Sequence, residues 1–358
     1  MVERPSRLRE FLNATLPENV TVRGSSEQKE PREKLVNDVL AGIKEATMSI
    51  RLTPYILSRI NWKNPRNDPI FRQFIPTMSA MLPDHPKLTL DSLHEKADSP
   101  VPGLVHRYRD KALFLQTVDK DSYKPILARW EKVFNYIENT PELEDIVVSG
   151  GDSYYLAPHQ IELIGDRLIS MPNIRRFRFA SKGLAVCPSR ILDPNDPWVD
   201  ALIAVSNKAR KARKAVALHT HFNHPNEISW VTEEASQKLN EAGVVVRNQT
   251  VLLRGVNDDV ETMSTLIRKL ANNNIVPVEH LRTPLQTILD LESRIRGSIA
   301  GFATPQFVVD LPEGGGKRLA CSHASYDRET GISTYRAPSV KENKVYEYHD
   351  PVASLLGD

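Results

Sequence analysis

The middle of the chain alternates short β-rich runs with segments of helical length, and this alternation restricts the folds that the chain can adopt. The β-rich runs are Ala112–Gln116, Asp145–Ser149, Arg176–Ala180, Ala215–Thr220 and Val244–Leu253. The helical segments are Pro125–Asn139, Pro158–Ser170, Pro197–Arg210, Thr232–Ala242 and Val260–Asn273. Repeated strand–helix units predict an α/β fold with a parallel sheet. Five or six such units are too few for a closed eightfold barrel, so we expect an open, partial βα barrel or a doubly wound sheet.

The residues before this pattern predict a helical region that is interrupted by prolines. In Pro31–Ser49, apolar residues recur at the spacing of one helical face, at Leu35, Val36, Val39, Leu40 and Ile43. Four prolines then divide the chain into short pieces, at Pro54, Pro65, Pro69 and Pro76.

Charge and composition exclude several classes of protein. The chain has 47 basic and 45 acidic residues, so it has no excess of positive charge for a nucleic-acid surface. No window approaches the roughly 18 apolar residues of a membrane span, and the charged N-terminus lacks the apolar stretch of a signal peptide. We therefore expect a cytoplasmic protein without nucleic-acid or membrane partners. Its only cysteines, Cys187 and Cys321, suit a reducing compartment and cannot supply three clustered thiolates.

Two motifs follow predicted strands. The run after Asp145 ends in Ser149-Gly150-Gly151-Asp152, where the glycines allow a close approach of the backbone to a ligand and Asp152 can accept a hydrogen bond. The alternative is an ordinary tight turn with an aspartate that caps a helix. The second motif contains His219, His221, His224 and Glu227, which have residue types suited to a zinc or iron site. The alternative there is a hydrogen-bonded strand-end histidine.

A glycine run near the C-terminus delivers a single lysine. Gly314, Gly315 and Gly316 precede Lys317, and such a run can form a concave backbone whose amides hold an anion. The lysine can pair with a phosphate or form a Schiff base with a carbonyl cofactor, or it can simply lie in a solvated loop. Far upstream, Arg107 and Tyr108 precede the first predicted strand. Arg107 can bind a phosphate through its guanidinium fork, and Tyr108 can stack against the ligand or donate a hydrogen bond to it. The alternative is that both residues lie on the surface.

Taken together, these motifs resemble the lysine 2,3-aminomutase family of radical SAM enzymes. The matching blocks, in order, are LHEKADSPVPGLVHRYRDKALFL, DIVVSGGD, LHTHFNHPNE, NQTVLLRGVND and PQFVVDLPEGGGK. The resemblance implies a partial βα barrel of the radical SAM type, preceded by helices. It also implies three cofactors: pyridoxal phosphate, S-adenosylmethionine and a 4Fe–4S cluster. In the family's reaction, an adenosyl radical takes a hydrogen from lysine bound as an aldimine, and the amino group migrates from carbon 2 to carbon 3.

The resemblance assigns roles to residues of this sequence. It implies that Lys317 holds pyridoxal phosphate when substrate is absent, and that Asp310 is one of two aspartates that bind the side-chain ammonium of the substrate. The remaining matches are at the cofactors. Arg107 and Tyr108 match residues at the phosphate, Gly314, Gly315 and Gly316 match the lysine loop, and the SAM-binding elements match Ser149, Gly150, Gly151, Asp152, His221 and Gln249. The histidines are then better explained as the lining of the SAM site than as a metal site.

The sequence departs from the family pattern at three places, and the second and third affect the predicted activity. Glu313 stands where the family has glycine. The loop after the first strand carries the cluster ligands in the family, spaced C-x3-C-x2-C, and an arginine for the substrate carboxylate. Here Thr117–Lys124 contains neither. Thiolates hold such clusters, so this chain has no metal ligands of the family type. The third departure follows Asn274, where a family strand with cofactor-stacking tyrosines and the second aspartate is expected to be missing.

The sequence therefore predicts an isomerase-type protein that resembles lysine 2,3-aminomutase but lacks its radical-generating loop. We expect a helical N-terminal region at 1–105, a partial βα barrel core at 106–310, and a C-terminal region with the cofactor lysine loop and tail at 311–358. The substrate implied by the resemblance is an amino acid, lysine, and the chain can form homo-oligomers. One alternative is an inactive paralogue that binds pyridoxal phosphate or SAM. Another is a metal-dependent barrel hydrolase that uses the histidines at 219, 221 and 224.

Overall fold

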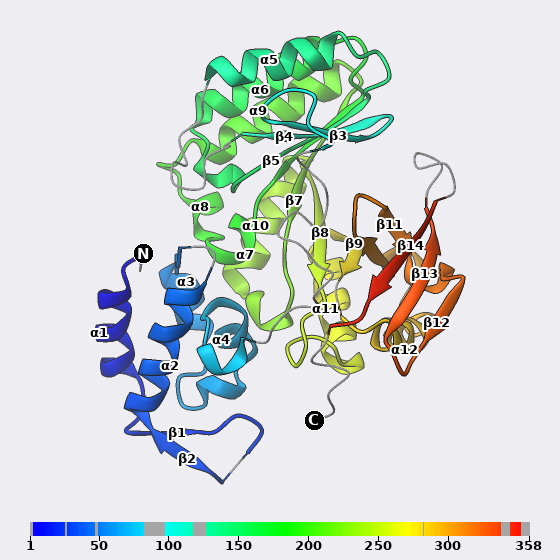
Figure 1. The fold of residues 1–358 in the computed structure, drawn as a ribbon. Helices are drawn as coiled ribbons and strands as arrows, with labels where there is room; N and C mark the ends of the chain where they lie inside the picture. The colour runs from blue at the N-terminus through cyan, green and yellow to red at the C-terminus, as the bar shows by residue number, and fades with distance from the viewer. Residues whose placement is uncertain are drawn as a thin grey trace.

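The computed structural model describes residues 3–25, 27–46, 49–81, 97–116, 127–281, 283–337 and 344–351. Its largest element is a nine-stranded sheet in the order β11-β10-β9-β8-β7-β6-β5-β4-β3 (Figure 1). The strands are β3 (Leu104–Tyr108), β4 (Lys111–Leu115), β5 (Asp145–Ser149), β6 (Arg176–Ala180), β7 (Ala215–Thr220), β8 (Val245–Val251), β9 (Ile275–Leu281), β10 (Gln306–Leu311) and β11 (Gly316–Leu319). Strands β4 to β10 are parallel, and the edge strands β3 and β11 pair antiparallel with their neighbours.

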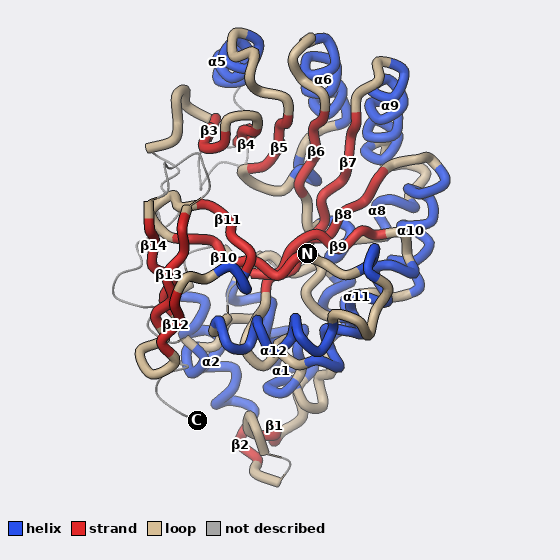
Figure 2. The backbone as a smooth tube through the Cα atoms, turned by 90° about the vertical axis from the view of Figure 1, so that its right-hand side faces the viewer, coloured by secondary structure: helices blue, strands red, loops and turns tan. Residues whose placement is uncertain are grey.

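The order of the strands in the sheet follows their order in the chain without a reversal. A doubly wound sheet reverses its strand order at a switch point, so that alternative is wrong. The sheet curves, and the long helices lie outside the curve (Figure 2). These helices are α5 (Leu127–Glu138), α6 (Pro158–Ser170), α9 (Trp198–Lys211), α10 (Trp230–Glu241), α11 (Val260–Asn272) and α12 (Leu285–Ile295). The predicted α/β class and the five predicted strand–helix units are confirmed.

Strand β9 corrects part of one expectation, because a strand does follow Asn274, although its sequence, IVPVEHL, contains no tyrosine and no aspartate. It pairs in parallel with β8 on one side and β10 on the other, so the sheet is continuous there. The register shifts after the Asn248–Pro277 pair, where Gln249 lies opposite Glu279 and Val278 is passed over. Proline has no N–H to give to the ladder, and a bulge is the usual way to accommodate it in a strand. The alternation of hydrophobic residues is weak in such a strand, which explains why the sequence pattern missed it.

The N-terminal residues build a separate hydrophobic cluster. Its helices are α1 (Pro5–Thr15), α2 (Arg32–Glu45), α3 (Pro54–Arg59) and α4 (Pro69–Phe74), with a two-stranded sheet of β1 (Asn19–Thr21) and β2 (Lys29–Pro31). Helix α2 confirms the predicted helix, although it ends earlier than predicted. Leu8, Leu35, Val39, Ile56 and Phe71 belong to the cluster and are almost completely buried. The region touches the rest of the protein where the Tyr55 hydroxyl donates to the Glu227 carbonyl at 2.7 Å.

The C-terminal residues add a small antiparallel sheet of β12 (Ser325–Asp327), β13 (Ile332–Arg336) and β14 (Val345–His349). Asp350 fixes this sheet to helix α12, because its carboxylate accepts from the Leu285 N–H at 2.8 Å and from the Tyr326 hydroxyl at 2.9 Å. Short helices complete the described residues: α7 (Gly183–Val186), α8 (Ser189–Leu192), and the 3-10 turns η1 (Pro65–Asn67), η2 (Met78–Ala80), η3 (Ser153–Tyr155), η4 (Pro225–Glu227), η5 (Gly301–Ala303) and η6 (Ala320–Ser322). Within the described part of the chain, we find no helix with the length and apolarity to cross a bilayer.

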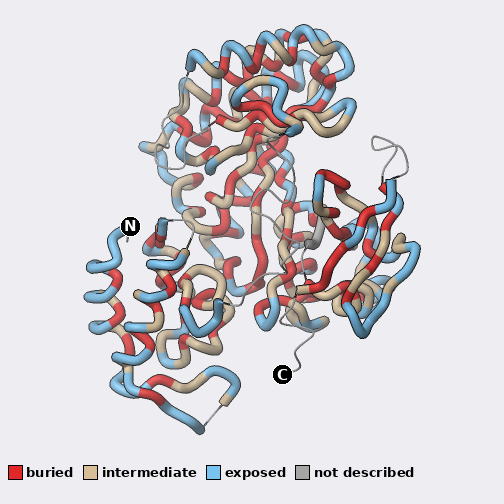
Figure 3. Tube along the Cα trace, in the orientation of Figure 1, coloured by how far each residue is buried: buried red, intermediate tan, exposed pale blue. Residues whose placement is uncertain are grey.

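The main core lies between the sheet and its outer helices, where buried residues follow the strands and the inner faces of the helices (Figure 3). Helices α6 and α9 pack closely at Gly165. A Cβ atom at this position would lie 2.5 Å from a methyl group of Val205 on the neighbouring helix. The glycine therefore sets the distance between the two helices, at the cost in helix propensity that glycine carries.

We predict that the effect of Gly165→Ala on stability changes sign with the residue at position 205. In the natural sequence, the clash with Val205 should lower the free energy of unfolding by about 1–3 kcal/mol. In a Val205→Ala background both methyl groups are gone, and only the Cβ atom of residue 205 stays close, at 3.2 Å. A small shift relieves that contact, so alanine should raise the free energy of unfolding by about 0.5 kcal/mol through helix propensity. Urea unfolding of the natural protein, Gly165→Ala, Val205→Ala and the double variant measures both effects. A stabilising Gly165→Ala in the natural background would contradict this account of the packing.

Candidate active site

One cavity of about 320 Å³ lies inside the curve of the sheet, and every strand of the sheet contributes to its wall. Parallel strands place alternate side chains on one face, so the inward positions of successive strands meet in this space. The residues that line it are Val105, Arg107, Tyr108, Lys111, Ala112, Leu113, Val147, Arg178, His219, Arg247, Gln249, Val278, Asp310 and Lys317. The cavity thus collects six of the residues singled out in the sequence: Arg107, Tyr108, His219, Gln249, Asp310 and Lys317.

The two edges of the open sheet meet at this cavity. The backbone N–H of Lys317 on β11 donates to the Tyr108 hydroxyl on β3 at 3.2 Å, across 209 residues of sequence. Gly316 makes this approach possible, because a Cβ atom there would lie 2.9 Å from the Tyr108 oxygen and the residue has a φ of +77°. Only glycine adopts such a φ without strain. The glycine run therefore brings a tyrosine from one edge against a lysine on the other.

The glycine run forms a tight hairpin turn between β10 and β11. The Gly315 N–H donates to the Pro312 carbonyl at 3.1 Å, and both central residues have positive φ, Glu313 at 56° and Gly314 at 75°. Turns of this kind match the twist of the strands, and they favour glycine, asparagine or aspartate at both positions. A glutamate at the first position is unusual there. The turn sets Asp310 directly opposite Lys317 in the ladder, so the acid and the amine leave the hairpin on the same face.

The cavity is strongly cationic. Its described lining contains Arg107, Lys111, Arg178, Arg247 and Lys317 against the single carboxylate of Asp310. Two of the arginines already have partners outside it: Arg107 donates to Asp98 at 2.9 Å, and Arg178 donates to Asp145 at 3.2 Å. The Lys111 ammonium lies 4.2 Å from the centre of the Tyr108 ring. This excess of positive charge suits a ligand with a phosphate or several carboxylates.

His219 stands on the cavity wall as a neutral imidazole. Burial, together with the positive charges of Arg178, Arg247 and Lys317, lowers the pKa of His219 from 6.5 to about 3. Its Nε2 atom is buried and has no hydrogen-bond partner among the described residues. A buried polar nitrogen without a partner is costly, and a bound ligand is one way to satisfy it.

The Ser149–Asp152 motif lies at the carboxyl end of β5 and does not line this cavity. Asp152 caps the 3-10 turn η3 by accepting from the Tyr154 N–H at 2.9 Å, and it also accepts from the Lys182 N–H at 3.1 Å and from the Ser181 hydroxyl. Burial raises the pKa of Asp152. Gly150 has a φ of +76° and lies against Leu115, which leaves no room for a side chain. The contacts of Asp152 are thus those of the capping aspartate that we considered as the alternative.

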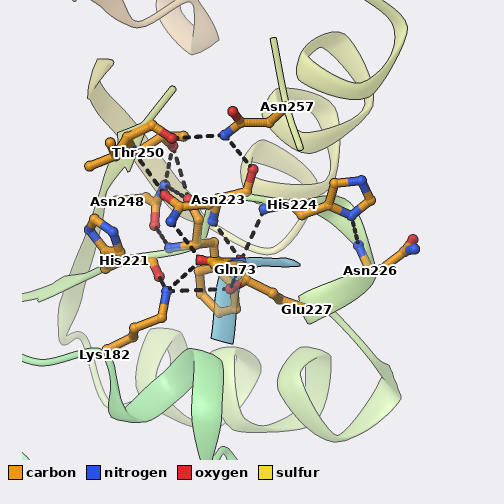
Figure 4. Close-up of polar contacts among 12 residues, drawn as sticks. Gln73, Lys182, His221, Asn223, His224, Asn226, Glu227, Asn248, Thr250 and Asn257 are labelled. Carbon is orange, nitrogen blue, oxygen red and sulfur yellow. Dashed lines mark hydrogen bonds and ion pairs between the residues drawn. The ribbon is translucent and has the colours of Figure 1, made fainter. Parts of the chain in front are cut away.

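A second polar cluster gathers at the carboxyl ends of β6, β7 and β8 (Figure 4). Glu227 is completely buried and accepts from the backbone N–H groups of Asn223 and His224 at 2.5 and 3.0 Å. Its other oxygen accepts from Gln73 at 3.0 Å and from Lys182 at 3.3 Å. The Lys182 ammonium also donates to the His221 carbonyl at 2.6 Å. This cluster fixes the loop after β7 to the loop after β6 and to helix α4.

The histidines do not converge on a metal site. His219 faces the sheet cavity, while the Nδ1 atom of His224 accepts from the Asn226 N–H at 3.1 Å in a local turn. Burial, together with the nearby charge of Lys182, lowers the pKa of His221 to about 3. In the part of the chain that the structure describes, no group of three His, Cys, Asp or Glu side chains is placed to bind a metal ion. The described residues therefore offer no site for the hydrolase alternative.

Sequence reasoning missed most of the cationic side chains of the cavity. Arg178 and Arg247 lie inside strands whose other residues are largely apolar or uncharged, and Lys111 begins β4. The sequence did contain a signal for these residues, because a charged side chain is unusual in the middle of a buried parallel strand. Arg178 has this position in Arg176-Phe-Arg-Phe-Ala180. Lys182 and Gln73 had no comparable signal, because their partners come from distant loops. The cysteine-free stretch at 117–124 lies outside the described residues.

We predict that His219 makes stability fall with acidification. Its pKa is about 3 in the folded protein and 6.5 without the fold, so only the unfolded chain takes up the proton between these values. The free energy of unfolding should therefore fall as pH drops from 6.5, by up to about 1.4 kcal/mol per pH unit for this group. Urea unfolding measured from pH 7 to pH 5 should show that the free energy of unfolding changes less with pH in His219→Asn than in the natural protein. The exposed His159→Asn is the control and should keep the natural slope, and equal slopes in all three proteins would refute the assignment.

Comparison with known proteins agrees with the motifs, although no protein-family model matches the chain. The L-lysine 2,3-aminomutase of Clostridium subterminale is 37% identical over 305 residues, which cover 77% of this chain and 70% of that protein. The L-lysine 2,3-aminomutase of Fusobacterium nucleatum is 35% identical over 76% of this chain and 67% of its own length. The glutamate 2,3-aminomutase of Clostridioides difficile is 30% identical over 77% of this chain and 68% of its own length. On this similarity, the chain belongs to the lysine 2,3-aminomutase family, a family of isomerases.

Proposed function

We propose that this chain binds pyridoxal phosphate at Lys317, on an open βα barrel of the radical SAM type, and that it takes a small amino acid as its ligand. The observation that carries the proposal is the pairing of Asp310 with Lys317 on a hairpin that faces a cationic cavity. Relatives named lysine and glutamate 2,3-aminomutase support the amino-acid class of the ligand.

The side chains around the cavity fit pyridoxal phosphate. Lys317 supplies the primary amine, and Arg107 with its neighbour Tyr108 supplies a fork and a hydroxyl for the phosphate. The unsatisfied Nε2 atom of His219 offers a further polar contact in the same space. When bound, the cofactor supplies a carbonyl that links reversibly to amino groups and stabilises charge at the adjacent carbon. The protein's part is to hold the phosphate and to orient Lys317 through its hydrogen bond to Tyr108.

The polar groups of the cavity also suit a zwitterionic amino acid. Asp310 is the carboxylate that would bind an ammonium group, as the family resemblance implies. Arg178 and Arg247 are cations that would receive a carboxylate, and they lie on β6 and β8 at the same face of the sheet. The family's carboxylate arginine belongs to the loop that this sequence lacks, so we assign its role to one of these two. The proposed substrate is lysine, and glutamate is the second candidate because the same cavity is rich in cations.

The family's 4Fe–4S cluster does not fit this chain. The sequence has two cysteines, and a cluster of this type needs three thiolates close together. Cys187 follows helix α7, whereas Cys321 lies in the η6 turn beyond β11. We therefore derive no step through a cluster. Ser149–Asp152, His221 and Gln249 are still proposed to contact S-adenosylmethionine, but its family anchor on the cluster iron is missing. The chain as written is proposed to bind cofactor and amino acid without turnover.

We predict that sodium borohydride fixes pyridoxal phosphate on Lys317. Reduction of the loaded protein followed by peptide mapping should show one modified lysine, in the peptide that contains Lys317. Lys111→Ala is the matched control, since it removes another cationic residue of the same cavity and should leave the modification in place. Lys317→Ala should abolish the modification. A modification at another lysine, or none in folded protein, would refute the assignment.

We predict that the chain does not interconvert lysine and β-lysine after reconstitution with iron, sulfide, reductant, S-adenosylmethionine and pyridoxal phosphate. The physical reason is that an unactivated C–H bond must break, which side-chain acids and bases cannot do unaided. Mass spectrometry of β-lysine is the measurement, with iron and sulfide content per chain as a second readout. The comparison protein carries a C-x3-C-x2-C loop with its arginine after Thr117. Turnover by the natural chain would contradict the proposal.

A further inference from the structure

Two residues that follow each other in the chain, Arg107 and Tyr108, both line the sheet cavity. In a regular strand, adjacent side chains point to opposite faces of the sheet. Strand β3 is irregular at this point, because its pairing with β4 shifts register between Val105 and Tyr108. Such an irregularity changes the direction of a side chain, and it lets both residues contribute to one wall.

Asp98 contacts this irregular stretch through two different groups. Its backbone carbonyl accepts from the His106 N–H at 2.8 Å, and its carboxylate accepts from the Nε atom of Arg107 at 2.9 Å. The intervening chain turns back at Gly103, where φ is 94°. The Gly103 carbonyl accepts from the Leu115 N–H of β4 at 2.8 Å, which fixes the turn to the sheet. The fold of this short segment therefore places the Asp98 carboxylate beside Arg107.

The contact with Asp98 uses only the Nε atom of Arg107. Within the part of the chain that the structure describes, neither terminal nitrogen of this side chain donates a hydrogen bond. The side chain is 10% exposed, and it lines the cavity. Arg178 differs, because one of its terminal nitrogens donates to Asp145 at 3.2 Å. A guanidinium that is held at Nε keeps both terminal N–H groups for a ligand, and this pair matches two oxygens of a phosphate.

We propose that Asp98 is a positioning residue for the cofactor phosphate, because it fixes Arg107 at Nε so that both terminal nitrogens donate to phosphate oxygens. The inference rests on the proposed function, which supplies the identity of the ligand. Asp98 does not touch the cofactor itself. Its role is to order the arginine before the phosphate arrives.

Two effects of the Asp98 carboxylate on phosphate binding oppose each other. A long arginine side chain loses rotamer freedom when it binds, and a partner that orders it in the free protein removes that loss. The negative charge of the carboxylate, however, repels the phosphate. The carboxylate contacts the Nε side of the guanidinium, so a phosphate on the terminal nitrogens is nearer to the positive charge than to Asp98. We therefore expect positioning to outweigh repulsion, and removal of the carboxylate to weaken phosphate binding.

Calorimetric titration of the full chain with pyridoxamine phosphate and with pyridoxamine tests the inference. Neither ligand carries the aldehyde that would link to Lys317, so the Kd of pyridoxamine divided by the Kd of pyridoxamine phosphate measures the contribution of the phosphate. In D98A this ratio should fall about fivefold, because Arg107 must then be ordered during binding. D98S, whose shorter side chain does not reach Arg107, should match D98A. D98N should change the ratio by less than about twofold, since its amide oxygen still accepts from Nε.

D110A is the matched control. Asp110 lies in the turn between β3 and β4, is exposed, and pairs with Arg176, which is absent from the described lining of the cavity. D110A therefore removes the same charge from the same hairpin but leaves Asp98 and Arg107 in place, and it should not change the ratio. R107Q should lower the ratio at least as far as D98A, and D98A should have no further effect in the R107Q background.

Each of the other outcomes overturns the inference. An unchanged ratio in D98A would show that Arg107 needs no partner, and a higher ratio would show that repulsion dominates. Equal losses in D98A and D110A would leave only net charge as the cause, and an equal loss in D98N would assign the effect to charge rather than to the hydrogen bond. A further loss from D98A in the R107Q background would show that Asp98 acts without Arg107, and a ratio near one in the natural chain would remove the phosphate site itself. Borohydride labelling of Lys317 is measured separately, so this inference can fail while the proposed cofactor lysine stands.

Discussion

A hydrogen bond between Lys317 and Tyr108 joins the two edges of the open sheet, and the proposed active site depends on it. The seven parallel strands supply a curved wall, but among the described strands β3 and β11 have no partner on their outer sides. The Lys317 N–H and the Tyr108 hydroxyl meet across that opening. This contact places the backbone of the proposed cofactor lysine against Tyr108, one of the residues proposed for the phosphate. The absence of a side chain at Gly316 is what permits it.

The charges of the molecule are arranged in two ways, with different consequences. Glu227, Lys182 and Gln73 form a closed network in which each buried polar group has partners, so it serves to hold loops in place. The sheet cavity is the opposite case, with five cationic side chains, one carboxylate and a neutral histidine. Satisfied buried networks rigidify a fold, whereas an excess of one charge in a cavity favours a ligand of the other sign.

The sequence predicted the repeated strand–helix units well. It predicted poorly which side chains from distant elements meet in the sheet cavity and in the loops. Strands β4 to β8 and their helices carry strong hydrophobic periodicity, and their order follows from chain connectivity. Strand β9 was missed because Pro277 interrupts its ladder. The hairpin lysine and its tyrosine were found through motifs that resemble a known family. Arg178, Arg247 and Lys182 were not, because their proximity depends on register and on loop packing that no local pattern records.

The contact between the sheet edges also has a consequence for how the protein is made. Each parallel strand pairs with the strand that precedes it in the chain, so the sheet can grow one unit at a time as the polypeptide emerges from the ribosome. Tyr108 is synthesised 209 residues before its partner Lys317. The proposed cofactor pocket is then completed by the last hairpin of the nine-stranded sheet to be translated. A nascent chain that stalls before β11 has most of this sheet but no lysine to bind the cofactor.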